Sequence, residues 1–144
     1  MKHILYIGLA VAAFLTLRAS GEPAEAKAIE GMWRPVTAEL AGKPMSETVL
    51  KTISLKLEDG EYEVLVGDHP DKGTYTLDLA AKPKGMTVTG TEGPNRGKIF
   101  PCIYELQGDT LRICYDLSCA KRPAEFKTAV GTRLYLVTYA RNKQ

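Results

Sequence analysis

The chain has 144 residues, of which 44% are hydrophobic and 25% charged, as is usual for one globular domain. Its formal net charge of +2 is small, and it lacks the basic excess typical of proteins that bind nucleic acids or anionic membrane surfaces. We therefore expect one soluble domain with no nucleic-acid partner.

Residues 1–26 have the order of a secretory signal peptide. A basic start, Met1-Lys2-His3, precedes the uncharged run Ile4–Leu17, which is shorter than the roughly 20 residues of a membrane-spanning helix. The segment ends with Ala24-Glu25-Ala26, a small-residue cleavage pattern. We predict cleavage after Ala26, with Gly21 as the second choice and an uncleaved anchor as the alternative. Residues 27–144 would then form an exported domain in the periplasm, the cell envelope or the medium, with no membrane span.

The first well-specified element is a β-hairpin over Thr52–Glu58 and Glu61–Val66, joined by Asp59-Gly60. An Asp-Gly pair between alternating segments is typical of a type I′ turn, which needs positive φ at both central residues. This turn fixes the register, so that one face carries only apolar pairs and the other an opposite-charge pair. The expected pairs are Leu57 with Tyr62, Leu55 with Val64, Ile53 with Val66, and Lys56 with Glu63.

A second hairpin is predicted over Phe100–Gln107 and Thr110–Tyr115, joined by Gly108-Asp109. It repeats the arrangement of an apolar inner face and a salt pair on the outer face. The expected pairs are Leu106 with Leu111, Tyr104 with Ile113, Cys102 with Tyr115, and Glu105 with Arg112.

Four further strands are expected at Met32–Ala38, Gly73–Asp78, Met86–Thr91 and Arg133–Ala140, with Ser46 capping a short helical turn. About eight short strands with turn-rich connections predict an all-β, antiparallel up-and-down barrel, although a sandwich is the other possible arrangement. The salt-paired faces must meet water, which disfavours an outer-membrane barrel, whose exterior is apolar.

Gly31-Met32-Trp33 resembles the G-x-W motif that opens lipocalins, and Arg141 matches the basic residue that packs over that Trp. Over nearly all of residues 27–144, the chain resembles a planctomycete-type family of uncharacterised, exported lipocalin-like proteins. The resemblance implies a lipocalin-like barrel and no particular ligand. Pro35 departs from the family pattern, and we expect it at an edge or a bulge. The matching segments are Gly31–Trp33, Gly42–Pro44, Lys72–Tyr75, Gly97-Lys98, Ile103–Leu106, Gly108–Leu111, Ile113-Cys114, Arg122-Pro123 and Glu125-Phe126.

No catalytic constellation stands out. His69 is the one histidine of residues 27–144 and has no neighbouring Cys or His, so we expect a solvated side chain and no metal site. Glu125, beside Arg122, is the acid to test first, although a local ion pair is its simpler explanation. We expect no cofactor and no enzymatic activity, with a hydrolytic enzyme as the less favoured alternative.

The inward faces carry the main functional expectation. Tyrosines there could line a ligand cavity, although core filling is the alternative. The expected role is a monomeric barrel that binds a small hydrophobic ligand, and the alternative is a protein-interaction or inhibitor module with a filled barrel. The expected interior residues are Trp33, Leu55, Tyr62, Val64, Tyr75, Tyr104, Leu111 and Ile113.

The cysteine count is odd, so one thiol must stay unpaired within the chain. Cys102 and Cys114 fall on opposite faces of neighbouring strands and should not bond to each other. We predict a Cys114–Cys119 disulfide across a turn, with Cys102 free and buried.

Overall fold

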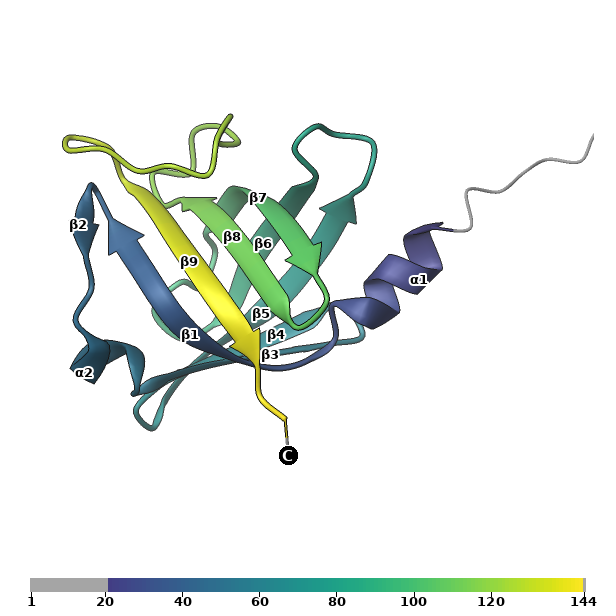
Figure 1. The fold of residues 1–144 in the computed structure, drawn as a ribbon, viewed down its shortest axis with the longest axis horizontal. Coiled ribbons are helices and arrows are strands. Elements are labelled where there is room, and N and C mark those ends of the chain that lie inside the picture. Colours follow the sequence, from purple (N-terminus) through teal and green to yellow (C-terminus); the bar gives the residue numbers. More distant parts are fainter. Residues whose placement is uncertain (1–20, 144) are drawn as a thin grey trace, which may run out of the picture.

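A computed structural model describes residues 21–143 of the chain (Figure 1). Nearly all of its regular structure is β. The elements are α1 (Gly21–Ala28), β1 (Gly31–Leu40), β2 (Lys43–Pro44), α2 (Glu47–Leu50), β3 (Ile53–Glu58), β4 (Glu61–Val66), β5 (His69–Asp78), β6 (Gly85–Glu92), β7 (Ile99–Gln107), β8 (Thr110–Asp116) and β9 (Leu134–Arg141).

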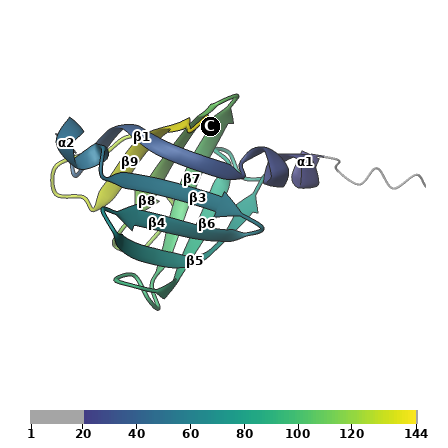
Figure 2. The same ribbon diagram turned by 90° about the horizontal axis from the view of Figure 1, so that it is seen from below.

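The strands close into an eight-stranded antiparallel barrel, as predicted. Sequential neighbours pair from β3 to β9, and β1 closes the ring because it pairs with both β3 and β9. Strands β3, β4 and β5 run across β6, β7 and β8 behind them (Figure 2). The pairing of β1 with β9 shifts register between Pro35 and Thr37, which leaves Val36 as an exposed bulge. The expectation that Pro35 marks a bulge is therefore confirmed.

Both hairpins have the predicted register. Leu57 pairs with Tyr62 across one turn, and Leu106 pairs with Leu111 across the other. Asp59 and Gly60 have φ of 50° and 77°, the positive values that a type I′ turn requires. The reason for this agreement is local, because a two-residue turn leaves only one register in which the apolar faces coincide.

One predicted salt pair differs from the structure. Lys56 lies opposite Glu63 in the ladder, but its ammonium group is 3.2 Å from Glu58 on its own strand, while Glu63 pairs with Lys72 at 3.6 Å. The flexible lysine stem reaches the neighbouring acid on the same face equally well, since residues two apart in a strand point the same way. Arg112 and Glu105 do form the predicted pair, at 3.4 Å.

Helix α1 lies at one end of the barrel, and α2 at the other (Figure 2). Immediately after α1, Ile29 is fully buried and accepts a hydrogen bond from the Trp33 indole N–H through its carbonyl oxygen, at 2.9 Å. At the opposite end, Ser46 caps α2 by accepting from the Val49 N–H, as the sequence predicts. The end near α1 is called here the closed end.

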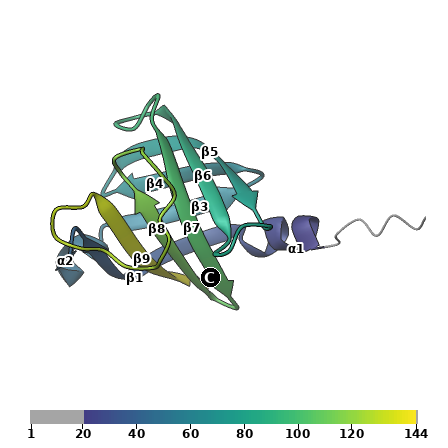
Figure 3. The same ribbon diagram turned by 90° about the horizontal axis from the view of Figure 1, so that it is seen from above.

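A long loop between β8 and β9, residues 117–133, folds back over the outer face of the barrel (Figure 3). Under it, Ile103 and Cys114 are buried although they point away from the barrel interior, and Thr128 is buried in the loop itself. Arg112 lies over the Phe126 ring, 4.0 Å from the centroid. The outer face of β7 and β8 is thus partly covered and does not simply face water.

The predicted signal peptide lies mostly outside the described residues, and its cleavage stays a prediction. Its last part belongs to α1, where Glu25 accepts hydrogen bonds from the Lys84 ammonium at 2.9 Å and the Tyr104 hydroxyl at 3.0 Å. Within the described residues, neither helix has the length and hydrophobicity required to span a membrane.

Candidate functional site

The barrel interior contains a cavity of about 180 Å³. Its lining reaches Val66, which is 48% exposed at the end of β4 farther from α1, so the cavity opens at that end of the barrel. Its wall is made of aliphatic, aromatic and a few polar side chains drawn from seven of the barrel strands and two loops. The lining residues are Ile53, Leu55, Leu57, Tyr62, Val64, Val66, Asp71, Tyr75, Met86, Val88, Asn95, Phe100, Ile113, Tyr115, Leu117, Tyr135 and Tyr139.

The structure brings together five of the eight interior residues expected from the sequence. Leu55, Tyr62, Val64, Tyr75 and Ile113 line the cavity. They come from three sequential strands and from β8, so alternation along each strand places them on one common surface.

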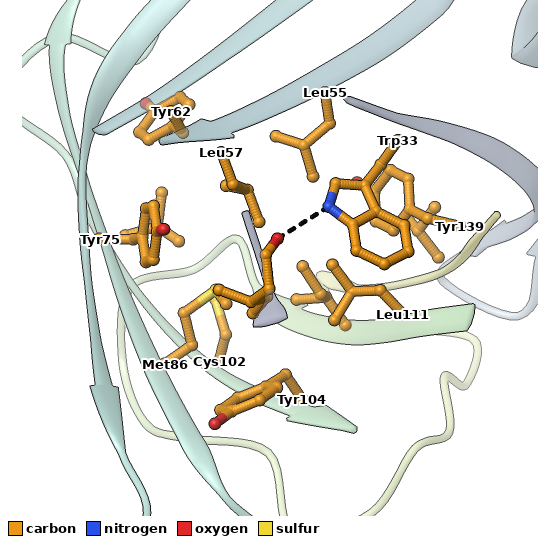
Figure 4. Close-up of a cluster of buried hydrophobic side chains, with 14 of the residues drawn as sticks. Trp33, Leu55, Leu57, Tyr62, Tyr75, Met86, Cys102, Tyr104, Leu111 and Tyr139 are labelled. Atoms are coloured by element: carbon orange, nitrogen blue, oxygen red, sulfur yellow. Dashed lines mark hydrogen bonds between the residues drawn. The ribbon is translucent and has the colours of Figure 1, made fainter. Parts of the chain in front are cut away.

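The other three expected residues, Trp33, Tyr104 and Leu111, lie inside the barrel but in the packed closed end. Each is at most 1% exposed, and they form part of the main hydrophobic core (Figure 4). The Tyr104 hydroxyl points away from the other labelled side chains toward Glu25 (Figure 4). These three residues therefore form the packed floor of the barrel and not the wall of the cavity.

A polar group lies on one wall of the cavity. Asp71 accepts from the Asn95 side-chain amide at 2.8 Å, from the Asn95 backbone N–H at 3.3 Å and from the Tyr62 hydroxyl at 3.5 Å. Burial, and next the negative charge of Asp71, raise the pKa of Tyr62 to about 12. At neutral pH, Tyr62 is thus a hydrogen-bond donor and never a phenolate.

Two glycines make this group possible. A Cβ at Gly73 would collide with the Thr89 carbonyl oxygen and lie 2.6 Å from Cε1 of Tyr62, so the missing side chain lets both β6 and the Tyr62 ring lie close against β5. A Cβ at Gly90 would collide with the backbone carbonyl of Asn95, so the β6–β7 loop folds against β6 only because of that glycine.

The part of the cavity wall formed by β8 and β9 carries three tyrosines, Tyr115, Tyr135 and Tyr139. The hydroxyls of Tyr115 and Tyr139 are 3.0 Å apart, and the Tyr115 ring stacks on Tyr135 with centroids 5.5 Å apart. Burial raises the pKa of all three phenols above the ordinary value. The hydrogen-bonded pair holds two protons and uses one in its mutual bond, so one proton remains for another acceptor.

Asp71 and Asn95 are the functional candidates that the sequence analysis missed. The sequence predicts a strand that begins at Gly73, yet β5 begins at His69. Every second residue of a strand points to the same face, so a strand that has Tyr75 and Gly73 on its inner face also has Asp71 there if it extends toward the N-terminus. No local signal marks Asn95, because its position depends on how the β6–β7 loop packs against a strand far from it in sequence.

The predicted Cys114–Cys119 disulfide is not present in the structure. Cys114 is buried under the loop, with its thiol 3.9 Å from the Lys127 carbonyl oxygen, whereas Cys119 is exposed in a turn with φ of 61°. The two side chains therefore leave the backbone toward different surroundings, which the sequence spacing alone did not reveal. Cys102 is free and fully buried in the barrel.

The other candidate side chains do not gather into a site. His69 is exposed at the start of β5, with Nε2 3.6 Å from Asp68, and Glu125 is exposed on the long loop. Among residues 21–143, no three His, Cys, Asp or Glu side chains are arranged to hold a metal ion.

No protein-family model and no curated protein matches this sequence. Among solved structures, the barrel is similar to the crystal structure of a DUF4847 family protein from Bacteroides vulgatus. The similarity covers 84% of this chain and 99% of that chain, with a TM-score of 0.50 and 14% sequence identity. At this identity the likeness concerns the fold alone.

Proposed function

We propose that this chain is an exported lipocalin-like barrel that binds a small, mostly apolar molecule inside the barrel. The observation that carries the proposal is the cavity of about 180 Å³ behind a wall of aliphatic and aromatic side chains. An apolar cavity of about 150 Å³ can hold benzene, while sites for drug-sized ligands run from roughly 300 to 1,000 Å³. The ligand is accordingly compact, of the size of a substituted single ring or a short acyl chain.

Two sequence features support the exported, lipocalin-like part of the proposal. Residues 1–26 have the order of a signal peptide, and Gly31-Met32-Trp33 resembles the lipocalin opening motif. Membership in the planctomycete-type family of exported lipocalin-like proteins is proposed on this basis.

Native mass spectrometry of protein purified from its own host tests the proposal. The native ion is expected to carry the mass of a small organic molecule that is lost under denaturing conditions. Val64→Phe should remove this mass because Val64 lines the cavity, and Val36→Phe should keep it because Val36 is 57% exposed on the outer bulge. Absence of bound mass, together with no heat of binding for ethylbenzene, would overturn the proposal.

A protein-interaction module that acts through its loops is the second candidate. Val130 is 84% exposed, and Leu40 and Val49 are 41% and 42% exposed. Such aliphatic side chains are typical of protein contacts when they form a continuous patch. An empty cavity combined with a co-purifying protein that Val130→Asp releases would favour this candidate.

A further inference from the structure

Within the part of the chain that the structure describes, the cavity wall carries one negative charge and no positive charge. Asp71 is the one carboxylate among the described lining residues, and no Lys, Arg or His side chain lines the cavity. A ligand carboxylate would therefore meet an apolar wall and a like charge with no cation to offset either. Burying a charge without a partner costs far more than burying a paired one.

Asp71 points into the cavity for a reason that lies in the strand register. It pairs with Val64 across β4 and β5, and Val64 faces inward. Asp71 is the third residue of β5, whose first residue lies at the open end of the barrel. Its carboxylate is thus reached by the polar end of a molecule whose apolar part lies deeper, against Tyr75 and Met86.

The Asp71 carboxylate retains capacity for another donor. A carboxylate offers about four lone-pair positions, and Asn95 occupies two of them at 2.8 and 3.3 Å. The third contact, from the Tyr62 hydroxyl, is long at 3.5 Å and lies at the limit of a hydrogen bond. A ligand donor can join this group or replace the Tyr62 contact without breaking the clamp from Asn95.

We propose that the ligand of the cavity carries a hydrogen-bond-donating head group, a protonated amine or a hydroxyl, which binds Asp71. This inference rests on the proposed ligand-binding role of the cavity. Carboxylic acids, which are anions at neutral pH, should not bind in this cavity. The spare proton of the Tyr115 and Tyr139 pair is available to a neutral oxygen of the same ligand, but it brings no positive charge to hold an acid.

Isothermal titration calorimetry with four compounds that share a phenyl ring tests the proposal on the wild-type protein. The compounds are ethylbenzene, 2-phenylethanol, 2-phenylethylamine and 3-phenylpropanoate. The amine is expected to bind on the order of ten- to a hundredfold more tightly than the acid, because its hydrogen bond to a carboxylate is charge-assisted. The alcohol should fall between the two.

Asp71→Asn should lower the affinity for the amine toward that for the alcohol. Glu63→Gln is the matched control, because it removes a carboxylate from the outer face of the neighbouring strand, where Glu63 pairs with Lys72. This variant should leave the order of the four ligands unchanged. If Asp71→Asn does not fold, the wild-type order still decides the question.

Equal or tighter binding of the acid, with ethylbenzene bound, would overturn the head-group proposal and leave the cavity's proposed function standing. Failure of all four compounds to bind, ethylbenzene included, would overturn the head-group proposal, and with no bound mass in the native protein it would overturn the proposed function as well.

Discussion

The guanidinium group of Arg141 lies over the indole ring of Trp33, 4.3 Å from the ring centroid, and joins the last strand to the first. Its Nη1 and Nη2 atoms donate to the carbonyl oxygens of Glu30 at 2.6 Å and Ala28 at 2.7 Å. One planar side chain thus holds the segment after α1 against the barrel. This contact has the geometry that the resemblance to lipocalins predicted for Arg141, which packs over Trp33.

Arg141→Lys is expected to lower the free energy of unfolding by about 1–3 kcal/mol, since an ammonium group cannot stack flat and serve both carbonyls. Urea denaturation measures this loss. Lys143→Ala is the control. Both Arg141 and Lys143 pair with Asp109, at 3.1 and 2.9 Å, but the Lys143 side chain is 75% exposed, so its removal should lower the stability by no more than about 0.5 kcal/mol. Equal stability of Arg141→Lys and the wild type would show that the Trp33 contact contributes little.

The sequence predicts the hairpins well because their determinants are local. The two-residue turns at Asp59-Gly60 and Gly108-Asp109 set the registers, and the apolar alternation on both sides agrees with them. The long loop was not predictable in this way. Its course depends on contacts such as those of Arg122 with Asp78 and Thr87, which are far apart in sequence.

The candidate site was only partly predictable for a related reason. Alternation indicates which side chains face inward, but it does not say whether they touch one another or enclose a space. Trp33 and Tyr104 face inward and pack at the closed end, whereas Tyr62 and Tyr75 face inward and line the cavity. The difference arises from Ile29, which fills the closed end from outside the barrel strands.

The hydrogen bonds of Asp116, at the start of the long loop, are expected to make the stability of the protein sensitive to acid. Burial opposes its charge, but the backbone N–H groups of Lys121, Ser118 and Ala120 and the Ser118 hydroxyl donate to the carboxylate and outweigh this effect, so that its pKa lies below the ordinary 3.8. A lowered folded-state pKa stabilises the protein above about pH 4, and this contribution is lost as the pH falls through the folded-state value.

Asp116→Asn should therefore destabilise the protein by about 1–3 kcal/mol at neutral pH and flatten the loss of stability below pH 4. Thermal unfolding between pH 2.5 and 7 measures both effects. Asp68→Asn, at a fully exposed turn, is the control and should change neither. A wild-type-like acid profile in Asp116→Asn would contradict the assignment.

The buried tyrosines predict a cooperative alkaline transition. The pKa of each of the six tyrosines of the barrel is raised, and burial is the largest cause in every case. A raised folded-state pKa stabilises the protein below about pH 10, and the contribution is lost as the pH rises through the folded-state values. Tyrosinate absorbance should thus appear together with the loss of near-ultraviolet circular dichroism. Ionisation of most tyrosines near pH 10 in the folded protein would contradict this.

Thiol chemistry tests the cysteine arrangement. Burial raises the pKa of Cys102 and Cys114, whereas Cys119 is exposed. One thiol should react quickly with a disulfide reagent in the native protein, and three should react after denaturation without reductant. Cys119→Ser should abolish the fast phase alone. Recovery of a single thiol after denaturation would instead support the Cys114–Cys119 bridge.

Glu25 lies within the predicted signal peptide, yet its side chain contacts the barrel. Its side chain is 18% exposed and accepts from Lys84 and Tyr104, although it lies before the predicted cleavage point after Ala26. Cleavage after Gly21, the second choice, would keep these contacts. We expect a chain that begins at Glu22 to be more stable by about 1–3 kcal/mol than one that begins at Lys27.

Urea denaturation of the two chains measures this difference, and Glu25→Ala in the longer chain should reproduce most of it. Lys27→Ala is the control, because the Lys27 side chain is 81% exposed and forms only a surface ion pair at 3.9 Å. Equal stability of the two chains would mean that the Glu25 contacts contribute nothing measurable and that cleavage after Ala26 costs the fold nothing. A loss confined to the shorter chain and to Glu25→Ala would show that the barrel needs α1 from Glu25 onward.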